Sequence, residues 1–286
     1  SVMDASKGIA FAYYNDAPIF EYIYGRKQGG QALPLLLIAT TARTGSEGNW
    51  AAVFTDTDHV KKGFALPALY PKESIVDPEL MTTLSSRGIA GPGFDALAHA
   101  IESFLSVRAN PFSKLYSRQA ILWLSEGLPK VQANPSDLET WERVALGSTF
   151  AGIAIGNAGC TAPHGIEHPI SGLLNVAHGE GLAAIYPEYM RFMRPHAQAD
   201  FAELARLLGA ETSGLTEEEA SLRAVEQVDA LLKTLGIAFT LSDLGVREGQ
   251  LDWLSRTALD SMPAVFANNP AAMTSDDIKT ILERRL

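Results

Sequence analysis

The sequence is poor in cysteine and has no long hydrophobic run. Cys160 is the single cysteine among 286 residues. One thiol cannot form an internal disulfide, so we expect Cys160 to be a buried thiol that packs as a small hydrophobic side chain. No apolar stretch reaches the roughly 18 residues of a membrane span, and the first residues lack the pattern of a signal peptide. We therefore expect a globular cytoplasmic protein that does not enter a membrane.

Basic residues are also scarce relative to acidic ones. Lysine and arginine total 23 against 33 aspartates and glutamates, so the formal net charge is −10. Binding to a phosphate backbone requires clustered lysine and arginine, so we expect no nucleic-acid partner. Hydrophobic residues make up 47% of the chain, which is ample for the packed core of one large domain or two ordinary ones.

Residues 1–87 have the pattern of an α/β unit. Short apolar or β-branched runs occur at residues 34–39, 51–55 and 73–76. The first run is continuously apolar, which is typical of a strand buried on both faces of a parallel sheet. These strands are too few to close a sheet, so we expect an α/β remnant rather than a complete cofactor-binding domain.

Residues 88–286 change to long amphipathic segments, which predict an all-α domain. Ser136 and Thr216 each precede a glutamate by three residues, the spacing of a capping box at a helix start. Gly236 suits the left-handed end of a helix, and Pro111 suits a first turn. The predicted fold class is thus an α/β remnant followed by an all-α domain.

Asp95 and His99 lie four residues apart in a segment with helical periodicity. This spacing places both side chains on one helix face, where they can reach one cation. Taken alone, such a pair more often marks a surface hydrogen bond than a metal site.

Three further histidines, His164, His168 and His178, lie close together in the sequence. Neutral imidazole is the commonest metal ligand in proteins, so this cluster together with the Asp95 segment predicts a metal centre. His164 and His168 are again one helical turn apart, and Pro169 predicts a kink or an early end of that helix.

These segments resemble a known family. Residues 93–102, Gly-Phe-Asp-Ala-Leu-Ala-His-Ala-Ile-Glu, resemble the first metal signature of the iron-containing (group III) alcohol dehydrogenases. His164-Gly-Ile-Glu-His168-Pro, followed ten residues later by His178-Gly, is similar to the second. Residues 40–47 and 75–80 resemble two further motifs in the expected order. The resemblance implies the dehydroquinate synthase-like, iron-type alcohol dehydrogenase fold, mostly helical in this chain.

The resemblance also implies roles for individual residues. The implied metal ligands are Asp95, His99, His164 and His178. A histidine at the place of His168 lies beside the reacting centre in the family, which implies proton relay, with a structural histidine as the alternative. Glu102 and Glu167 could accept hydrogen bonds from ligand imidazoles, but we expect exposed helix residues there. His59 and His196 match no motif and are expected to be solvated.

The implied chemistry is the interconversion of a primary alcohol and an aldehyde. One carboxylate and three imidazoles suit Fe²⁺ or Zn²⁺ and leave a position for a substrate oxygen, on which the metal acts as a Lewis acid. Hydride passes to or from NAD or NADP. The implied partners are a small alcohol or aldehyde and further copies of the chain, as a homodimer or a higher homo-oligomer.

The cofactor contacts that the resemblance implies are Ser1, Asp4, Thr40, Thr41, Thr44 and Lys61. Thr40 and Thr41 follow the first predicted strand, where open α/β sheets bind ligands. Arg43 stands where the family usually has glycine, so it either meets a phosphate or obstructs the nicotinamide pocket. Residues 1–7 resemble the end of the family's glycine-rich motif without its glycines, so we expect a truncated chain or a fragment.

Two alternatives stay open at this stage. The chain could be a lyase of the related dehydroquinate synthase group, although the spacing of Asp95 and His99 speaks against that ligand set. It could also be a non-catalytic helical module, left by truncation, that keeps its metal only as a structural staple.

Overall fold

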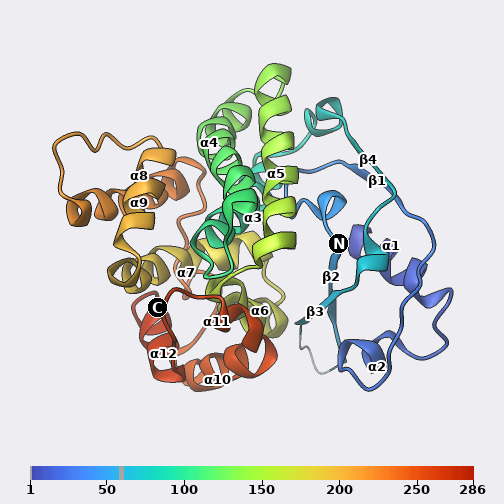
Figure 1. Ribbon diagram of the computed structural model, residues 1–286. Coiled ribbons are helices and arrows are strands. Elements are labelled where there is room, and N and C mark those ends of the chain that lie inside the picture. The colour runs from blue at the N-terminus through green and yellow to red at the C-terminus, as the bar shows by residue number, and fades with distance from the viewer. Residues whose placement is uncertain (1, 58–60) are drawn as a thin grey trace.

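A large helical part and a smaller N-terminal part make up the molecule. The computed structural model describes residues 2–57 and 61–286 (Figure 1). The N-terminal part contains helices α1 (Val2–Ala12) and α2 (Ile19–Ile23) and four short strands. The helices of the larger part are α3 (Ser86–Leu105), α4 (Pro111–Ala133), α5 (Leu138–Ala158), α6 (Ala162–Leu174), α7 (His178–Met193), α8 (Gln198–Leu207), α9 (Glu217–Thr234), α10 (Leu251–Ser261), α11 (Pro263–Ala267) and α12 (Ser275–Glu283).

The strands form two separate pairs. Strand β1 (Leu36–Ala39) runs parallel to β4 (Glu73–Val76), and β2 (Ala51–Thr55) runs antiparallel to β3 (Lys61–Ala65). The three strands predicted from the sequence are thus confirmed. Strand β3 was missed, because Lys-Lys-Gly-Phe-Ala has little intrinsic strand preference and is extended by its pairing with β2.

Burial of β1 on both faces was a wrong prediction. Leu37 and Ala39 are buried, but Leu36 is 53% exposed and Ile38 is 45% exposed. Only the face toward α1 is covered, because Leu37 packs there in a small core cluster with Leu35 and with Ala10 of α1. An apolar run does not determine whether one face or both faces of a strand are buried. The elements that pack against the strand decide this.

Helix ends follow the predicted caps with one exception. Thr216 forms the predicted capping box, and Gly236 has a φ of +70° just beyond α9. Pro111 lies in the first turn of α4. Ser136 was wrong as a cap: Asp137 accepts from the backbone N–H of Thr140 instead, because its carboxylate also suits the positive end of the helix.

The sequence predicted either a kink or an early helix end at Pro169. The early end was a wrong prediction. The helix continues to Leu174. Proline removes one backbone hydrogen bond, but Ile166 and Ile170 are buried on this helix and pack into the main core, which holds the two halves together.

Close backbone contacts bring the site elements together. A Cβ on Gly179 in α7 would lie 2.1 Å from the carbonyl oxygen of Gly91 in α3, so only glycine lets these helices approach this far. Likewise, a Cβ on Gly152 of α5 would lie 2.1 Å from the carbonyl oxygen of Gly45. The first contact places the start of α7 against α3, and the second holds the loop after β1 against α5.

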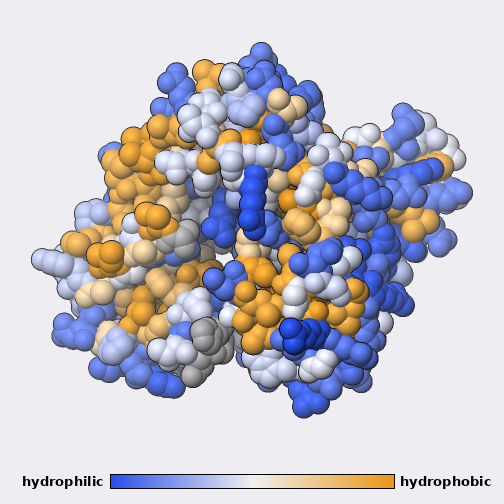
Figure 2. Space-filling view, turned by 180° about the vertical axis from the view of Figure 1, so that it is seen from behind, coloured by the Kyte–Doolittle hydropathy of each residue, from blue (hydrophilic) through white to orange (hydrophobic). Residues whose placement is uncertain are grey.

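Viewed from behind, the molecule is hollowed between its two parts, with hydrophobic side chains on both sides of the hollow (Figure 2). Among the helices of the described residues, none is by itself long and apolar enough to span a membrane. Helices α5 and α6 meet the test of length and composition only as a pair, with a bend of 107° between them.

Candidate metal centre

Four predicted ligands meet where three helices converge. Asp95 and His99 project from α3, His164 from α6, and His178 is the first residue of α7. The Oδ1 atom of Asp95 lies 3.3 Å from Nε2 of His164, 3.5 Å from Nδ1 of His99 and 3.6 Å from Nε2 of His178. One carboxylate oxygen is therefore surrounded by nitrogen atoms from all three helices.

Three of the four side chains form one candidate metal-binding group. Potential ligand atoms of Asp95, His164 and His178 lie within 4.8 Å of one another. His99 joins them through Asp95 and stacks on the His164 ring, with 4.2 Å between ring centroids.

A second group within the same limit consists of His99, Cys160 and His164. Cys160 is a free thiol and only partly buried, and the apolar surroundings with Glu102 and Asp95 raise its pKa well above the ordinary value.

Two buried carboxylates lie behind the imidazoles. The Nδ1–H of His164 donates to Oε1 of Glu102 at 2.7 Å, and Nδ1–H of His178 donates to Glu167. Both glutamates are fully buried. The expectation of exposed helix residues was wrong, because α3 and α6 are both covered by neighbouring helices at these positions.

This second layer fixes the orientation of the ligand rings. An imidazole that donates from Nδ1 keeps Nε2 as an acceptor directed at the centre. Glu102 follows Asp95 by seven residues and Glu167 follows His164 by three, so each shares a helix face with a predicted ligand. That spacing was the signal that could have revealed both roles from the sequence.

The charges at the centre depend strongly on burial. Burial by itself would raise the pKa of Asp95, but His178, His99, the hydrogen bond with His164 and the Arg43 guanidinium together hold it well below the ordinary value. Burial would lower the pKa of His164, yet Glu102 and Asp95 raise it to about 10. The site therefore attracts positive charge to the point between Asp95 and His164.

His99 and His168 are neutral for the opposite reason. Burial and the neighbouring His164 lower the pKa of His99 to about 3. Burial, together with His178, His164 and Lys61, holds the pKa of His168 well below its usual range. Within the described residues, the Nδ1 atoms of both rings are buried without a hydrogen-bond partner.

The residues fit a divalent cation. Asp95, Glu102 and Glu167 are fully buried within one cluster, and His99 offers a buried nitrogen without a partner. Buried carboxylates are stable only when paired or bound to metal. A set of one direct carboxylate and imidazole nitrogens is typical of Fe²⁺ and Zn²⁺ sites.

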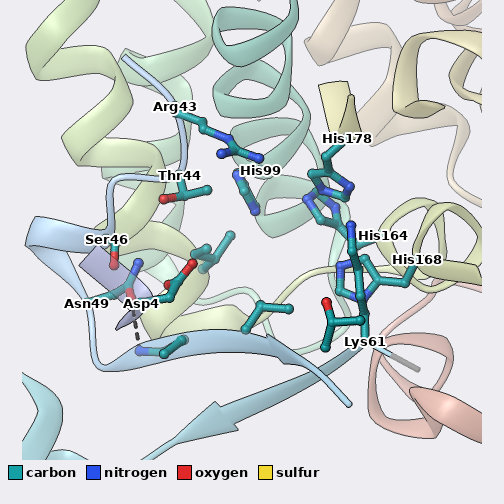
Figure 3. A pocket seen from close by; sticks show the side chains of 15 residues that line it. Asp4, Arg43, Thr44, Ser46, Asn49, Lys61, His99, His164, His168 and His178 are labelled. Carbon is teal, nitrogen blue, oxygen red and sulfur yellow. Dashed lines mark hydrogen bonds between the residues drawn. The ribbon is translucent and has the colours of Figure 1, made fainter. Parts of the chain in front are cut away.

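A cavity of about 200 Å³ adjoins the centre. Figure 3 shows the imidazoles on one side and Asp4, Ser46 and Asn49 on the other. The described residues that line it are Asp4, Arg43, Thr44, Ser46, Asn49, Ala51, Ala52, Val53, Thr55, Lys61, His99, Ile155, His164, His168 and His178. The catalytic candidate His168 thus faces the same cavity as His99, His164 and His178.

The predicted cofactor residues divide into two sets. Asp4, Thr44 and Lys61 line the cavity, and Nζ of Lys61 donates to Oγ of Ser171 at 2.6 Å. Thr40 and Thr41 are exposed and are not among the lining residues.

Ser1 and His59, both singled out from the sequence, lie outside the described residues. His196 is exposed, which confirms the expectation that it is solvated.

Lys7 organises one wall of the cavity and was not predicted as a site residue. It is fully buried, and its ammonium donates to the carbonyl oxygens of Ser46, Asn49 and Ala51 at 2.8–2.9 Å and to Oγ of Ser46 at 2.8 Å. Burial lowers its pKa to about 8, against the raising effect of Asp4 and Glu47. Lys7 therefore anchors the loop that carries Ser46 and Asn49.

Arg43 contacts the metal centre directly. Its Nε–H donates to Oδ2 of Asp95 at 3.3 Å, while Oδ1 of the same carboxylate faces the imidazoles. The two outcomes expected for this residue, contact with a phosphate or obstruction of the nicotinamide pocket, both concern a bound cofactor and stay predictions.

Family models match both parts of the chain, and known relatives match nearly all of it. Residues 89–286 match the model of the "Fe-containing alcohol dehydrogenase family, C-terminal", and residues 1–78 match "Iron-containing alcohol dehydrogenase". Long-chain-alcohol dehydrogenase 1 of Geobacillus thermodenitrificans is 34% identical over 289 residues, covering 99% of this chain and 72% of the relative. The NAD-dependent methanol dehydrogenase of Bacillus methanolicus is 32% identical, covering 99% and 74%.

Comparison with solved structures gives a similar result for the fold. A crystal structure of 1,3-propanediol oxidoreductase superposes with a TM-score of 0.94 at 30% identity, covering 100% of this chain and 75% of that one. The predicted fold class is thereby confirmed, including its mostly helical character.

Proposed function

Because the chain belongs to the iron-containing alcohol dehydrogenase family, we propose that it interconverts a primary alcohol and an aldehyde at a divalent cation held by Asp95, His99, His164 and His178. Metal-dependent exchange between alcohol and aldehyde is the activity of the family, and its relatives include an NAD-dependent enzyme. The observation that carries the ligand assignment is the Oδ1 atom of Asp95, which has three imidazole nitrogens within 3.6 Å.

The residues around the cation prepare it for this chemistry. A bound Fe²⁺ or Zn²⁺ supplies Lewis acidity toward the substrate oxygen. Glu102 and Glu167 orient the rings of His164 and His178 through Nδ1, so that Nε2 of each ring would be left to bind the cation. Burial of the centre removes water, which strengthens each electrostatic interaction within it.

His168 is the proposed proton-transfer residue. Its ring lies 5.3 Å from that of His178, centroid to centroid. It lines the cavity but is not one of the proposed metal ligands. Since its pKa lies well below the usual range, the ring is neutral at physiological pH and would pass a proton on rather than retain it.

The cofactor is proposed to bind along the opposite wall. NAD or NADP exchanges a hydride with the reacting carbon. Asp4 and Thr44 lie on that wall, where Lys7 holds the loop with Ser46 and Asn49 in place, whereas Lys61 lies on the imidazole side near His168 (Figure 3). Thr40 and Thr41 follow β1 at the rim and are proposed to contact the cofactor further from the reacting ring.

Metal analysis tests this proposal. Protein purified without oxygen should contain about one Fe or Zn per chain, and both metal and alcohol oxidation should disappear in Asp95→Ala and His178→Ala. His196→Ala is the matched control, because that histidine is exposed and lies outside the cavity lining. A wild-type chain that binds no divalent cation would refute the ligand set. The relatives are dehydrogenases, so a lyase is not proposed.

We further propose that the chain works in the cytoplasm and assembles into a homodimer or a higher homo-oligomer. The exposed side chains Leu36, Ile38 and Ile75 on the β1–β4 pair support a pairing surface. Light scattering of the purified chain tests the assembly, and a mass equal to one chain at micromolar concentration would refute it.

A further inference from the structure

Arg43 is a cation in the cavity wall that the proposed reaction leaves without a role. It lies in the loop between β1 and the turn at Gly45, where the resembled motif usually has glycine. Its side chain is 36% exposed and lines the cavity together with the imidazoles. Figure 3 shows the guanidinium directed from the loop toward His99 and His178.

Most of the hydrogen-bonding capacity of Arg43 is unused. Nε–H donates to Oδ2 of Asp95, at a long 3.3 Å. Across residues 2–57 and 61–286, the two terminal amino groups have no acceptor within hydrogen-bond distance. Arginine has five N–H donors in a planar fork, a shape that matches both oxygens of a carboxylate.

The charge around the cavity favours an anion beside this fork. Lys61 adds a second positive charge to the lining, against the single carboxylate of Asp4 among the described lining residues, and its ammonium donates to the neutral hydroxyl of Ser171. The carboxylate that Arg43 contacts, Asp95, is the one shared with three imidazoles and with the proposed cation. Asp95 is therefore only partly available to pair with the guanidinium.

We propose that Arg43 binds an anionic group of the substrate, so that this chain acts on alcohols and aldehydes that carry a carboxylate or a similar planar oxyanion. This inference rests on the proposed function and names the substrate class of the same site. Because the guanidinium touches a metal ligand, the anionic group and the reacting carbon lie a short chain apart, and the cavity of about 200 Å³ suits a small molecule.

A set of matched substrates tests this role. Reduction of glyoxylate, 3-oxopropanoate and 4-oxobutanoate is compared with that of acetaldehyde, propanal and butanal by the metal-loaded enzyme with NADH. In the wild type, at least one oxo acid should exceed the alkanal of equal length in kcat/KM by roughly 10- to 100-fold, the range of a charge-assisted hydrogen-bonded pair. Arg43→Gln should abolish this preference by raising KM for the oxo acids far more than it changes KM for the alkanals. Arg43→Lys should retain part of it, since a lysine keeps the charge without the fork.

Arg87 supplies the control variant. It also donates to a carboxylate, that of Glu180, but its side chain is 77% exposed and it is not among the lining residues. Arg87→Gln should therefore keep the wild-type substrate preference.

Measurement of ligand binding without turnover is an independent test of the role of Arg43. By calorimetry, 4-hydroxybutanoate should bind the metal-loaded wild type at least about tenfold more tightly than 1-butanol, and Arg43→Gln should remove the difference. This measurement decides the role of Arg43 even if no aldehyde is turned over, an outcome that would count against the proposed function alone.

Three results would overturn the inference. Equal preference for oxo acids and alkanals in the wild type, together with equal binding of the two alcohols, removes its basis. A weaker dissociation constant for NADH or NADPH in Arg43→Gln, with substrate preference kept, assigns the arginine to a cofactor phosphate. Loss of the bound metal with equal loss for both aldehyde classes shows that Arg43 acts only by positioning Asp95.

Discussion

Glu102→Gln is the substitution that most directly tests the second layer of the metal centre. Oε1 of Glu102 accepts from Nδ1 of His164 at 2.7 Å, and Oε2 accepts from the backbone N–H of Thr161 at 2.9 Å. Glutamine has nearly the same shape but only one acceptor oxygen, so one of the two N–H groups would face an amide NH₂. An unsatisfied buried donor costs about 1–3 kcal/mol, and loss of a second-shell carboxylate typically weakens metal binding about 10- to 100-fold.

The assay is competition between the protein and a chelator for Zn²⁺, together with urea unfolding of the metal-free chain. We expect the affinity for Zn²⁺ to fall by that factor and the metal-free protein to lose stability. Glu139→Gln is the control, because the Glu139 side chain is 81% exposed on α5. It should change neither quantity.

The alternative protonation state gives a different result. Burial is the largest effect and raises the pKa of Glu102 above its ordinary value, although the charge and hydrogen bond of His164 and the N–H of Thr161 act in the opposite direction. If burial prevailed and Glu102 carried a proton, glutamine would be nearly equivalent to it. A dissociation constant for Zn²⁺ within twofold of the wild type would therefore refute the ionised carboxylate and the argument built on it.

Three further predictions concern stability and the cofactor wall. The metal-free chain should lose stability below about pH 6.5, because His99 and His168 have lowered folded pKa values and take up protons only on unfolding. His164, raised to about 10, should add a second loss as the pH rises from 6.5 to 10, and urea titrations at pH 5, 6.5 and 9 should show a maximum near the middle value. Lys7→Met should weaken NADH binding measured by fluorescence and lower the melting temperature by several degrees, because buried acceptors in the loop lose their donor; unchanged binding would contradict the anchoring role. Gly179→Ala should destabilise the chain by roughly 1–3 kcal/mol in urea, since its Cβ would lie 2.1 Å from a backbone carbonyl of α3, and an unaffected variant would contradict that close approach.

The convergence of Asp95, His99, His164 and His178 could be predicted because two of these residues follow a local pattern, while their role as metal ligands stays a proposal. The spacing of Asp95 and His99 sets them on one helix face, and the structure confirms that helix. Resemblance of the motifs supplied His164 and His178, which meet Asp95 although they lie 69 and 83 residues away in the chain. The division into parts at residues 87 and 88 stays a prediction.

The second layer and the cavity wall were not predictable in the same way. Glu102 and Glu167 look like ordinary helix carboxylates until α3, α6 and α7 pack together and bury them. The contact of Arg43 with Asp95 spans 52 residues, and no local pattern indicates it.

By itself the sequence determined the helices with their caps, three of the strands and the chemical types of the metal ligands. These features depend on interactions within a few residues, such as hydrogen bonds one turn apart and alternating polarity. Tertiary structure alone decided that β1 is covered on one face, that β3 pairs with β2, that two carboxylates are buried behind the imidazoles and that Arg43 faces the centre. Burial and charge depend on which distant elements pack together, because the free energy of a charged group is set by the solvent it loses and the partners it gains.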